Sequence, residues 1–322
     1  MTVLIALALV MGGLALLAVG GDVLVRGAVA LARVAGLTTA VIGLTVVALG
    51  TSMPELVVSV VASFRGQPDI TVGNVIGSNL FNTLVILGVM AVLRPVPVHS
   101  GAVRVDWPVM LLVTAVALLA IRDGFVDRAE GAVFVMGLAA FVALSVWIAR
   151  REVTRAEAEP IVKRVEGPVV RDGWRAVTQS TALVVTGLAA LILGGRILVD
   201  GAVQLARIIG VTERVIGLTI VAAGTSAPEL AASIAAGRKG HADLAVANLL
   251  GSNIFNLLGI LGVTALITPV PVSAAILRFD AWWMLGSAVV LFPLMRIGRN
   301  INRVDGSLLL AAYLVYLGLL LT

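Results

Sequence analysis

The sequence has no cysteine, only two histidines and few charged residues. Of its 322 residues, 13% are charged and 60% are hydrophobic, and the mean hydropathy is +1.09. The lack of cysteine excludes disulfides and thiolate metal sites, and His99 and His241 are too few for a histidine-rich metal centre. Soluble domains are about 25% charged and about 45–50% apolar, so this composition predicts a polytopic membrane protein.

The basic residues are spread singly between apolar runs. The net charge is +5 and the isoelectric point is about 10.6, but scattered Lys and Arg residues are typical of the flanks of membrane spans. We therefore expect a lipid bilayer around the chain and no nucleic acid as a partner. No basic residue precedes the N-terminal apolar run, so we expect a first membrane helix there rather than a cleaved signal peptide.

Ten apolar runs approach the length of about 20 residues that a membrane helix needs. Between the fifth and sixth runs, residues 149–175 are charged, mixed in sign and contain two prolines, so we expect a solvated loop. The predicted fold is an all-α polytopic membrane protein, with five helices over 1–148 and five over 176–322. The runs lie near 3–20, 37–63, 72–93, 106–121, 126–148, 176–195, 211–236, 246–267, 281–295 and 306–321.

The two halves repeat at a constant offset of 174 residues. "VIGLTVVALGTSMPEL" at 41–56 recurs as "VIGLTIVAAGTSAPEL" at 215–230, and an ungapped alignment of 41–93 with 215–267 gives 30 identities in 53 positions. Five spans per half is an odd number, so the second half enters the membrane from the opposite side. We expect two inverted five-helix repeats with broken helices at the midplane, as in many secondary transporters.

The distribution of Lys and Arg predicts the orientation. With ten spans, 16 of these residues lie on the side that holds the 149–175 loop, and 7 lie on the other side. The positive-inside rule places the loop in the cytoplasm and both termini outside the inner, or plasma, membrane.

Each repeat places a proline, a glycine and a glutamate inside an apolar run. Pro54 lacks an N–H group and its ring crowds the carbonyl of Gly50, so the helix should break there and leave carbonyls unpaired. Gly50 would supply the conformational freedom for the break. Pro228 and Gly224 repeat the arrangement. Unpaired backbone in a membrane is tolerated where it is buried in protein or lines a wet cavity.

Polar side chains share one face with each glutamate. Thr51, Ser52, Glu55 and Ser59 are spaced i, i+1, i+4 and i+8, so they lie on one side of a helix. Carboxylates, hydroxyls and carbonyls are the ligands of hard cations such as Ca²⁺ and Na⁺. A carboxylate within the membrane costs at least ~2.5 kcal/mol and indicates function by default. The second repeat carries the same set as Thr225, Ser226, Glu229 and Ser233.

The following span in each half adds a second polar stripe. Asn74, Ser78 and Asn82 lie four residues apart on one helix face, and Gly77 beside them permits close backbone approach or a further break. The second repeat has Asn248, Ser252, Asn256 and Gly251 at the equivalent positions. Three aspartates near predicted span ends are expected to be interface charges or caps rather than ligands: Asp22, Asp106 and Asp280.

The motifs resemble those of one transporter superfamily. "GTSMPE" with "GNVIGSNLFN", and "GTSAPE" with "ANLLGSNIFN", are similar to the two α-repeats of the cation/Ca²⁺ exchangers, in particular the prokaryotic sodium/calcium exchangers. The resemblance covers nearly the whole chain, including the span number and the central loop. It implies a ten-helix antiporter with first and second α-motifs at 41–93 and 215–267.

The resemblance also implies roles for individual positions. Glu55 and Glu229 would be the central carboxylates, shared by Ca²⁺ and Na⁺. Backbone carbonyls of Thr51 and Thr225 would bind Ca²⁺. Asn82 and Asn256 would lie at the middle of the site. The Na⁺ sites would use hydroxyls of Ser52, Ser226, Ser78 and Ser252 and carbonyls of Ala48 and Ala222.

Asn256 departs from some relatives, which carry aspartate at that place. With asparagine at both middle positions, the site has two formal negative charges, from Glu55 and Glu229. These neutralise one Ca²⁺ or two monovalent ions. The departure argues against potassium co-transport and leaves a third Na⁺ site open.

The resemblance implies exchange of Ca²⁺ for Na⁺ by alternating access, normally with Ca²⁺ leaving the cell. The ions are cargo, and we expect no cofactor, no protein partner and function as a monomer. A Ca²⁺/H⁺ antiporter on the same fold is the nearest alternative, although the four serines favour Na⁺. A cation channel would need carboxylate or carbonyl rings around a multisubunit axis. An intramembrane protease is disfavoured because "GGD" at 20–22 lacks a second aspartyl motif.

Overall fold

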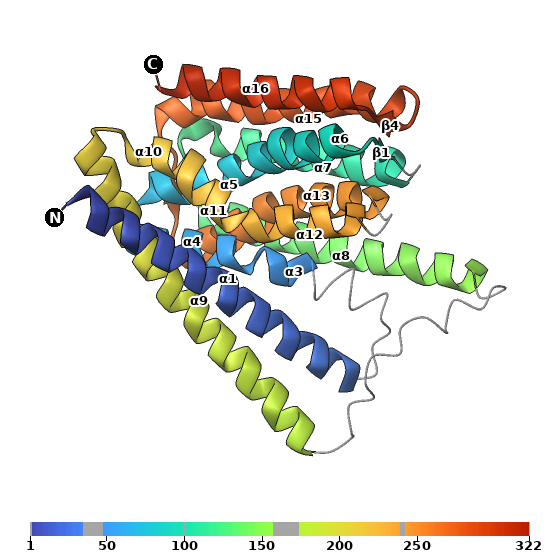
Figure 1. The fold of residues 1–322 in the computed structure, drawn as a ribbon, viewed down its shortest axis with the longest axis horizontal. Helices are drawn as coiled ribbons and strands as arrows, with labels where there is room; N and C mark the ends of the chain where they lie inside the picture. Colours follow the sequence, from blue (N-terminus) through green and yellow to red (C-terminus); the bar gives the residue numbers. More distant parts are fainter. Residues whose placement is uncertain (1, 35–47, 99–100, 157–173, 239–241, 322) are drawn as a thin grey trace.

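The computed structural model describes residues 2–34, 48–98, 101–156, 174–238 and 242–321 (Figure 1). These residues are almost entirely helical. The first half contains α1 (Val3–Val34), α3 (Ala48–Thr51), α4 (Met53–Phe64), α5 (Pro68–Leu80), η2 (Phe81–Ile86), α6 (Leu87–Leu93), η3 (Ala102–Asp106), α7 (Trp107–Ala120), η4 (Ile121–Asp123) and α8 (Arg128–Ala156). The second half contains α9 (Trp174–Ile209), α10 (Glu213–Ile216), η6 (Gly217–Val221), α11 (Ala222–Thr225), α12 (Ala227–Arg238), α13 (Ala242–Phe255), η7 (Asn256–Leu261), α14 (Gly262–Ile267), η8 (Ile276–Asp280), α15 (Ala281–Arg296) and α16 (Arg303–Leu321).

Nine of the ten predicted spans correspond to helical segments of the described chain. Eight helices of the described chain are long and apolar enough to cross a membrane, and there are nine such segments if one bent pair of helices is counted as a single span. The remaining predicted span, 37–63, is described only from residue 48 onward, where α3 and α4 form its second part. The chain is therefore a multi-helix integral membrane protein, as the composition predicts.

The predicted helix breaks occur at a serine in each half. Ser52 separates α3 from α4 with φ −89° and ψ 5°, and Ser226 separates α11 from α12 with φ −83° and ψ 5°. Between Glu213–Thr225 and Ala227–Ile234 the helix axis bends by 40°. Proline follows two residues after each serine, so the continuous hydrogen-bond ladder cannot pass through this point.

Gly50 and Gly224 serve a purpose other than the predicted one. Among the described glycines, only Gly66, Gly124, Gly210 and Gly298 have positive φ, so the break does not use the special backbone freedom of glycine. A Cβ atom at Gly50 would collide with Val25, and one at Gly224 would collide with Leu14. Both partners lie on α1, so these glycines leave room for the α1 side chains beside the broken helices.

Helices α1 and α9 form an antiparallel pair beside the rest of the molecule (Figure 1). A Cβ at Gly13 would lie 2.6 Å from the Leu198 nitrogen, and one at Gly20 would lie 2.9 Å from the Leu191 nitrogen. A step of seven residues forward on α1 is thus a step of seven back on α9. Glycines recur every seven residues on both helices and at the 174-residue offset: Gly13, Gly20 and Gly27 on α1, Gly187, Gly194 and Gly201 on α9.

Other local features also recur at the repeat offset. The π-helical segments η3 and η8 are 174 residues apart, and η2 and η7 nearly so. The all-α prediction missed four short strands, which form two antiparallel pairs, each joining one half to the other. β1 (Val96–Pro97) pairs with β4 (Asn300–Ile301), and β2 (Phe125–Val126) pairs with β3 (Val270–Pro271). The Pro-Val-Pro sequences at 95–97 and 269–271, which include β1 and β3, prevent the preceding helices from continuing.

The predicted 149–175 loop is partly helical. Helix α8 continues to Ala156 and α9 begins at Trp174, while residues 157–173 lie outside the described chain. The sequence "RREVTRA" at 150–156 contains Arg, Glu and Ala, which favour helix without an apolar face. The membrane helix therefore extends past the end of its apolar run.

Candidate ion-binding site

Two buried glutamates lie in the first turns of the helices that follow the breaks. Glu55 of α4 is 2% exposed and Glu229 of α12 is 1% exposed. Ser226 donates a hydrogen bond to Oε1 of Glu55 at 3.1 Å, and Ser52 donates to Oε1 of Glu229 at 3.1 Å. Each carboxylate is thus bound by the serine that stands three residues before the other glutamate. The two α-motifs therefore build one centre between them.

Most of the buried polar atoms without partners belong to predicted site residues. Among the described residues, nine buried side-chain oxygen or nitrogen atoms have no hydrogen-bond partner, and six of them belong to predicted site residues. An unpaired buried polar atom typically costs about 1–3 kcal/mol, so such a concentration needs a functional reason. The six are Glu55 Oε2, Glu229 Oε2, Ser78 Oγ, Ser252 Oγ, Asn82 Oδ1 and Asn256 Oδ1.

The six atoms form three pairs related by the 174-residue offset, one pair each of carboxylate, hydroxyl and amide oxygens. The segments that carry them also contact each other across the halves. Helix α4, which carries Glu55, packs against η7, which begins at Asn256; helix α12, which carries Glu229, packs against η2, which contains Asn82. The segments that carry the glutamates and the middle asparagines of the two motifs therefore lie against each other.

Asn74 connects the two broken helices, although it was not among the predicted ligands. Its Nδ2 donates to the Glu55 carbonyl at 3.1 Å and to Ser59 Oγ at 3.0 Å. Its Oδ1 accepts a hydrogen bond of 3.1 Å from the Thr225 hydroxyl. Asn74 is fully buried. It fixes the first turn of α4 against the end of α11, and thereby the position of Glu55 relative to the second half.

Among the predicted carbonyl ligands, the structure gives hydrogen bonds for the carbonyl of Ala222. The Ala222 carbonyl accepts hydrogen bonds from the Ser226 amide at 3.0 Å and the Thr225 hydroxyl at 3.3 Å. The Thr225 hydroxyl has one hydrogen and is also within bonding distance of Asn74 Oδ1, so it can donate there when the Ala222 carbonyl binds an ion. Thr51 ends α3 and is half-buried, and Ala48 begins α3 with its side chain outside the description.

Two further asparagines are bonded to the predicted middle residues of the centre. Asn79 and Asn253, the asparagines of the two "GSN" motifs, are 3% and 4% exposed. They bond the amides of Asn256 and Asn82, respectively. The repeated "GSN" motif marks both residues in the sequence. Residues three apart lie on nearly the same face of a helix, so the sequence does not show which asparagine would bind an ion and which would support it.

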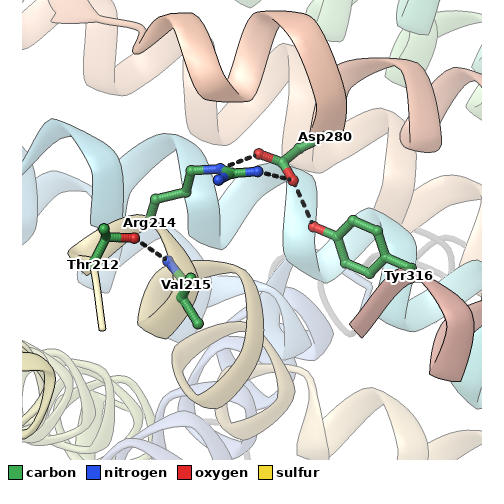
Figure 2. A network of polar contacts seen from close by, with 5 residues as sticks. All are labelled: Thr212, Arg214, Val215, Asp280 and Tyr316. Atoms are coloured by element: carbon green, nitrogen blue, oxygen red, sulfur yellow. Dashed lines mark hydrogen bonds and ion pairs between the residues drawn. The ribbon is translucent and has the colours of Figure 1, made fainter. Parts of the chain in front are cut away.

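A buried ion pair fixes the start of the second broken span (Figure 2). Arg214 of α10 donates from Nε to Asp280 Oδ2 at 2.6 Å and from Nη2 to Oδ1 at 3.0 Å, and the Tyr316 hydroxyl donates to Oδ1 at 3.0 Å. Asp280 is fully buried, so the expectation of an interface charge or cap is wrong for it. The network joins α10, η8 and α16. By contrast, Asp22 is exposed and pairs with Arg26.

The donor set limits the chemistry of the centre. Among the described residues, no group of three or more His, Cys, Asp or Glu could hold a metal ion. The centre instead combines two carboxylates with neutral hydroxyl, amide and carbonyl oxygens. Oxygen ligands with modest charge suit hard cations that must also leave again. A multi-helix membrane fold around a buried, oxygen-lined centre is typical of a membrane transport protein.

Comparison with known proteins identifies the family. A family model described as "Sodium/calcium exchanger protein" matches residues 5–147 and 179–322, which is most of both halves. The chain therefore belongs to the sodium/calcium exchanger protein family. This is a family of antiporters rather than enzymes, in agreement with the resemblance seen in the motifs.

Similar proteins extend over most of the chain. It is 39% identical over 271 residues to the putative antiporter CaxA of Alkalimonas amylolytica, covering 83% of each chain. It is 38% identical over 274 residues to the inner membrane protein YrbG of Escherichia coli K12, covering 84% of this chain and 82% of YrbG. The sodium/calcium exchanger MaX1 of Methanosarcina acetivorans is 28% identical over 303 residues, covering 83% of this chain and 84% of its own.

Solved structures share the fold. The sodium-calcium exchanger NCX_Mj, soaked with 2.5 mM Na⁺ and 10 mM Sr²⁺, superposes with a TM-score of 0.65 at 29% identity. The match covers 98% of this chain and 99% of that one. The likeness thus includes both halves.

Proposed function

We propose that this protein is a secondary active antiporter that exchanges Ca²⁺ for Na⁺ by alternating access. The observation that carries the proposal is the set of three offset-related pairs of unpartnered, buried oxygens at the meeting point of the two α-motifs. Relatives named as a sodium/calcium exchanger and as a putative antiporter support it. With an inward Na⁺ gradient, the normal direction would be extrusion of Ca²⁺.

The charge of the centre explains why exchange would be obligatory. Glu55 and Glu229 supply two formal negative charges, which balance one Ca²⁺ or two Na⁺ ions. The cargoes compete for the same carboxylates and cannot be carried together. An empty site would leave two carboxylates unpaired in a low-dielectric interior, which is strongly unfavourable. Crossing without cargo would therefore be rare.

The hydroxyls support Na⁺ as the counter-ion. Proton coupling would require only that the two glutamates take up protons when Ca²⁺ leaves. Ser78 and Ser252 would then have no role, yet both keep a buried hydroxyl without a partner within the described chain. We assign these two, with Ser52 and Ser226, to Na⁺ binding. Glu55, Glu229, Asn82, Asn256 and the carbonyls near Thr51 and Thr225 would form the central site.

The transport test uses vesicles that contain the purified protein. Proteoliposomes loaded with Na⁺ are expected to take up ⁴⁵Ca²⁺ from a Na⁺-free medium, and Glu55→Gln is expected to abolish the uptake. Glu130→Gln, at the start of α8 and outside the site, is the matched control that should retain it. Uptake driven by a pH gradient without Na⁺ would contradict Na⁺ coupling and favour the Ca²⁺/H⁺ alternative. Flux that needs no ion on the opposite side would indicate a channel.

We further propose ten spans in two inverted repeats, a cytoplasmic 149–175 loop and both termini outside the plasma membrane. The antiparallel packing of α1 and α9, which are equivalent by the 174-residue offset, supports the inversion. The chain lacks cysteine, so single cysteines can report the orientation. Phe125→Cys should react with an impermeant maleimide in intact cells, and Ile297→Cys only after permeabilisation. The reverse pattern would contradict the proposed orientation.

A further inference from the structure

The amides of Asn82 and Asn256 are held in one orientation each. Nδ2 of Asn82 donates to Oδ1 of Asn253 at 3.1 Å, and Nδ2 of Asn256 donates to Oδ1 of Asn79 at 2.9 Å. The oxygen and nitrogen of an amide leave the same carbon in different directions. Oδ1 of Asn82 and of Asn256 is therefore turned away from its asparagine partner, and both atoms are buried without a partner in the described structure.

Asn79 cannot reverse its own amide without loss. Its Nδ2 lies 3.4 Å from the backbone carbonyl of Asn253 and 3.6 Å from the sulfur of Met284. A carbonyl oxygen and a thioether sulfur accept hydrogen bonds and cannot donate them. A reversed Asn79 would set its oxygen against these two acceptors. Its Oδ1 is thus held toward Asn256, and Asn256 donates its NH₂ group to it.

Asn253 is held in the equivalent way. Its Nδ2 donates to the Thr83 hydroxyl at 2.9 Å and lies 3.6 Å from the sulfur of Met110. The hydroxyl can act as donor or acceptor, but the sulfur only accepts, so the amide orientation is again fixed. Met110 and Met284 are 174 residues apart and are 1% and 2% exposed. In both halves, therefore, a buried methionine sulfur accepts from the supporting asparagine and helps to fix its orientation.

We propose that Asn79 and Asn253 are positioning residues, which turn the amides of Asn82 and Asn256 so that their oxygens face the transported cation. The inference rests on the proposed function, because it assumes a cation at this centre. A reversed amide would present an NH₂ group, with partial positive charge, to the ion. The orientation matters in this chain because two carboxylates are the site's whole formal charge, and neutral oxygens must complete the coordination.

The proposal predicts a specific coupling between residues. Asn253→Leu removes the acceptor that holds the Asn82 amide, and should weaken Ca²⁺ binding about tenfold. In an Asn82→Asp background the same change should cost less than about twofold, because a carboxylate presents oxygen on both sides. A purely structural role of Asn253 would give the same loss in both backgrounds. Binding is measured by calorimetric titration of the purified full chain with Ca²⁺.

Asn79→Leu is the matched control. It should lower Ca²⁺ affinity as much as Asn253→Leu does, but its cost should stay unchanged by Asn82→Asp and be relieved by Asn256→Asp. Equal costs in every background, or relief of Asn79→Leu by Asn82→Asp, would overturn the proposal. Thr83→Val provides a milder variant if Asn253→Leu does not fold, with a smaller loss that Asn82→Asp should also relieve.

A second ion separates this inference from the proposed function. If the wild-type chain neither binds nor transports Ca²⁺, the proposed cargo is wrong. The same set of variants is then read with Na⁺ alone, as the shift of the thermal unfolding temperature in detergent. The predicted coupling between Asn253 and Asn82 with Na⁺ would sustain the positioning role, and its absence would refute it.

Discussion

Ser78 and Ser59 are both buried, but their hydroxyls differ in hydrogen bonding. Ser78 Oγ has no partner in the described structure, whereas Ser59 Oγ accepts a hydrogen bond from Asn74. Ser78→Ala should leave the ion-free protein as stable or up to about 1 kcal/mol more stable, because an unpaired buried hydroxyl is unfavourable. It should nevertheless reduce stabilisation by Na⁺. Thermal unfolding in detergent, with and without Na⁺, measures both effects.

Ser59→Ala is the counterpart for this experiment. It removes the acceptor of a buried amide and should destabilise the ion-free protein by about 1–3 kcal/mol. The Na⁺-dependent increase in unfolding temperature should be kept. An unchanged Na⁺ response in Ser78→Ala would contradict the assignment of that hydroxyl to a Na⁺ site.

At the residue scale, the duplicated motif identified candidate ligands but not the residues that support them. Glu55 and Glu229 stand out because a carboxylate in an apolar run is costly and each occurs at the same place in its repeat. The role of Asn79 depends on Met284 and on the Asn253 carbonyl, which are distant in sequence. Likewise, the need for Gly50 comes from Val25 on another helix. Such contacts exist only in the folded chain.

At the scale of the elements, the α1–α9 interface depends on glycine at specific heptad positions. Gly20→Ala would place a Cβ 2.9 Å from the Leu191 nitrogen and force the helices apart. We expect a loss of about 1–3 kcal/mol, as for other overpacked sites. Gly12→Ala on the same helix is the control, because nothing lies within 4 Å of its Cβ position. Equal unfolding temperatures for the two variants would contradict this account.

The elements themselves were predictable to different degrees. Apolar length gave the spans, and Pro54 and Pro228 gave the breaks, because both effects act within a few residues. The π-helical segments η2 and η7 were not anticipated. No local sequence pattern predicts the i→i+5 hydrogen bonds of a π-helix. The same holds for the short strands, which pair residues from opposite halves.

At the scale of the whole molecule, Arg214 and Asp280 join segments that are far apart in sequence. Arg214→Met would leave the fully buried Asp280 carboxylate without its counter-ion, and should cost about 3–5 kcal/mol. Adding Asp280→Leu should recover most of that loss, because apolar groups can replace a buried pair at little cost. A double variant less stable than Arg214→Met would contradict the expected order. Thermal unfolding in detergent is the measurement.

The Arg214 network also distinguishes the two halves. At the 174-residue offset, the positions of Arg214 and Tyr316 are Ala40 and Val142, while Asp280 corresponds to Asp106. In a transporter of two identical inverted halves, the states open to either side would be related by a two-fold rotation and equal in free energy. Here the Arg214–Asp280 ion pair cannot form at the equivalent positions of the first half, because Ala40 replaces the arginine. The resting population should therefore favour one membrane face, and half-saturating Ca²⁺ concentrations measured from the two faces should differ.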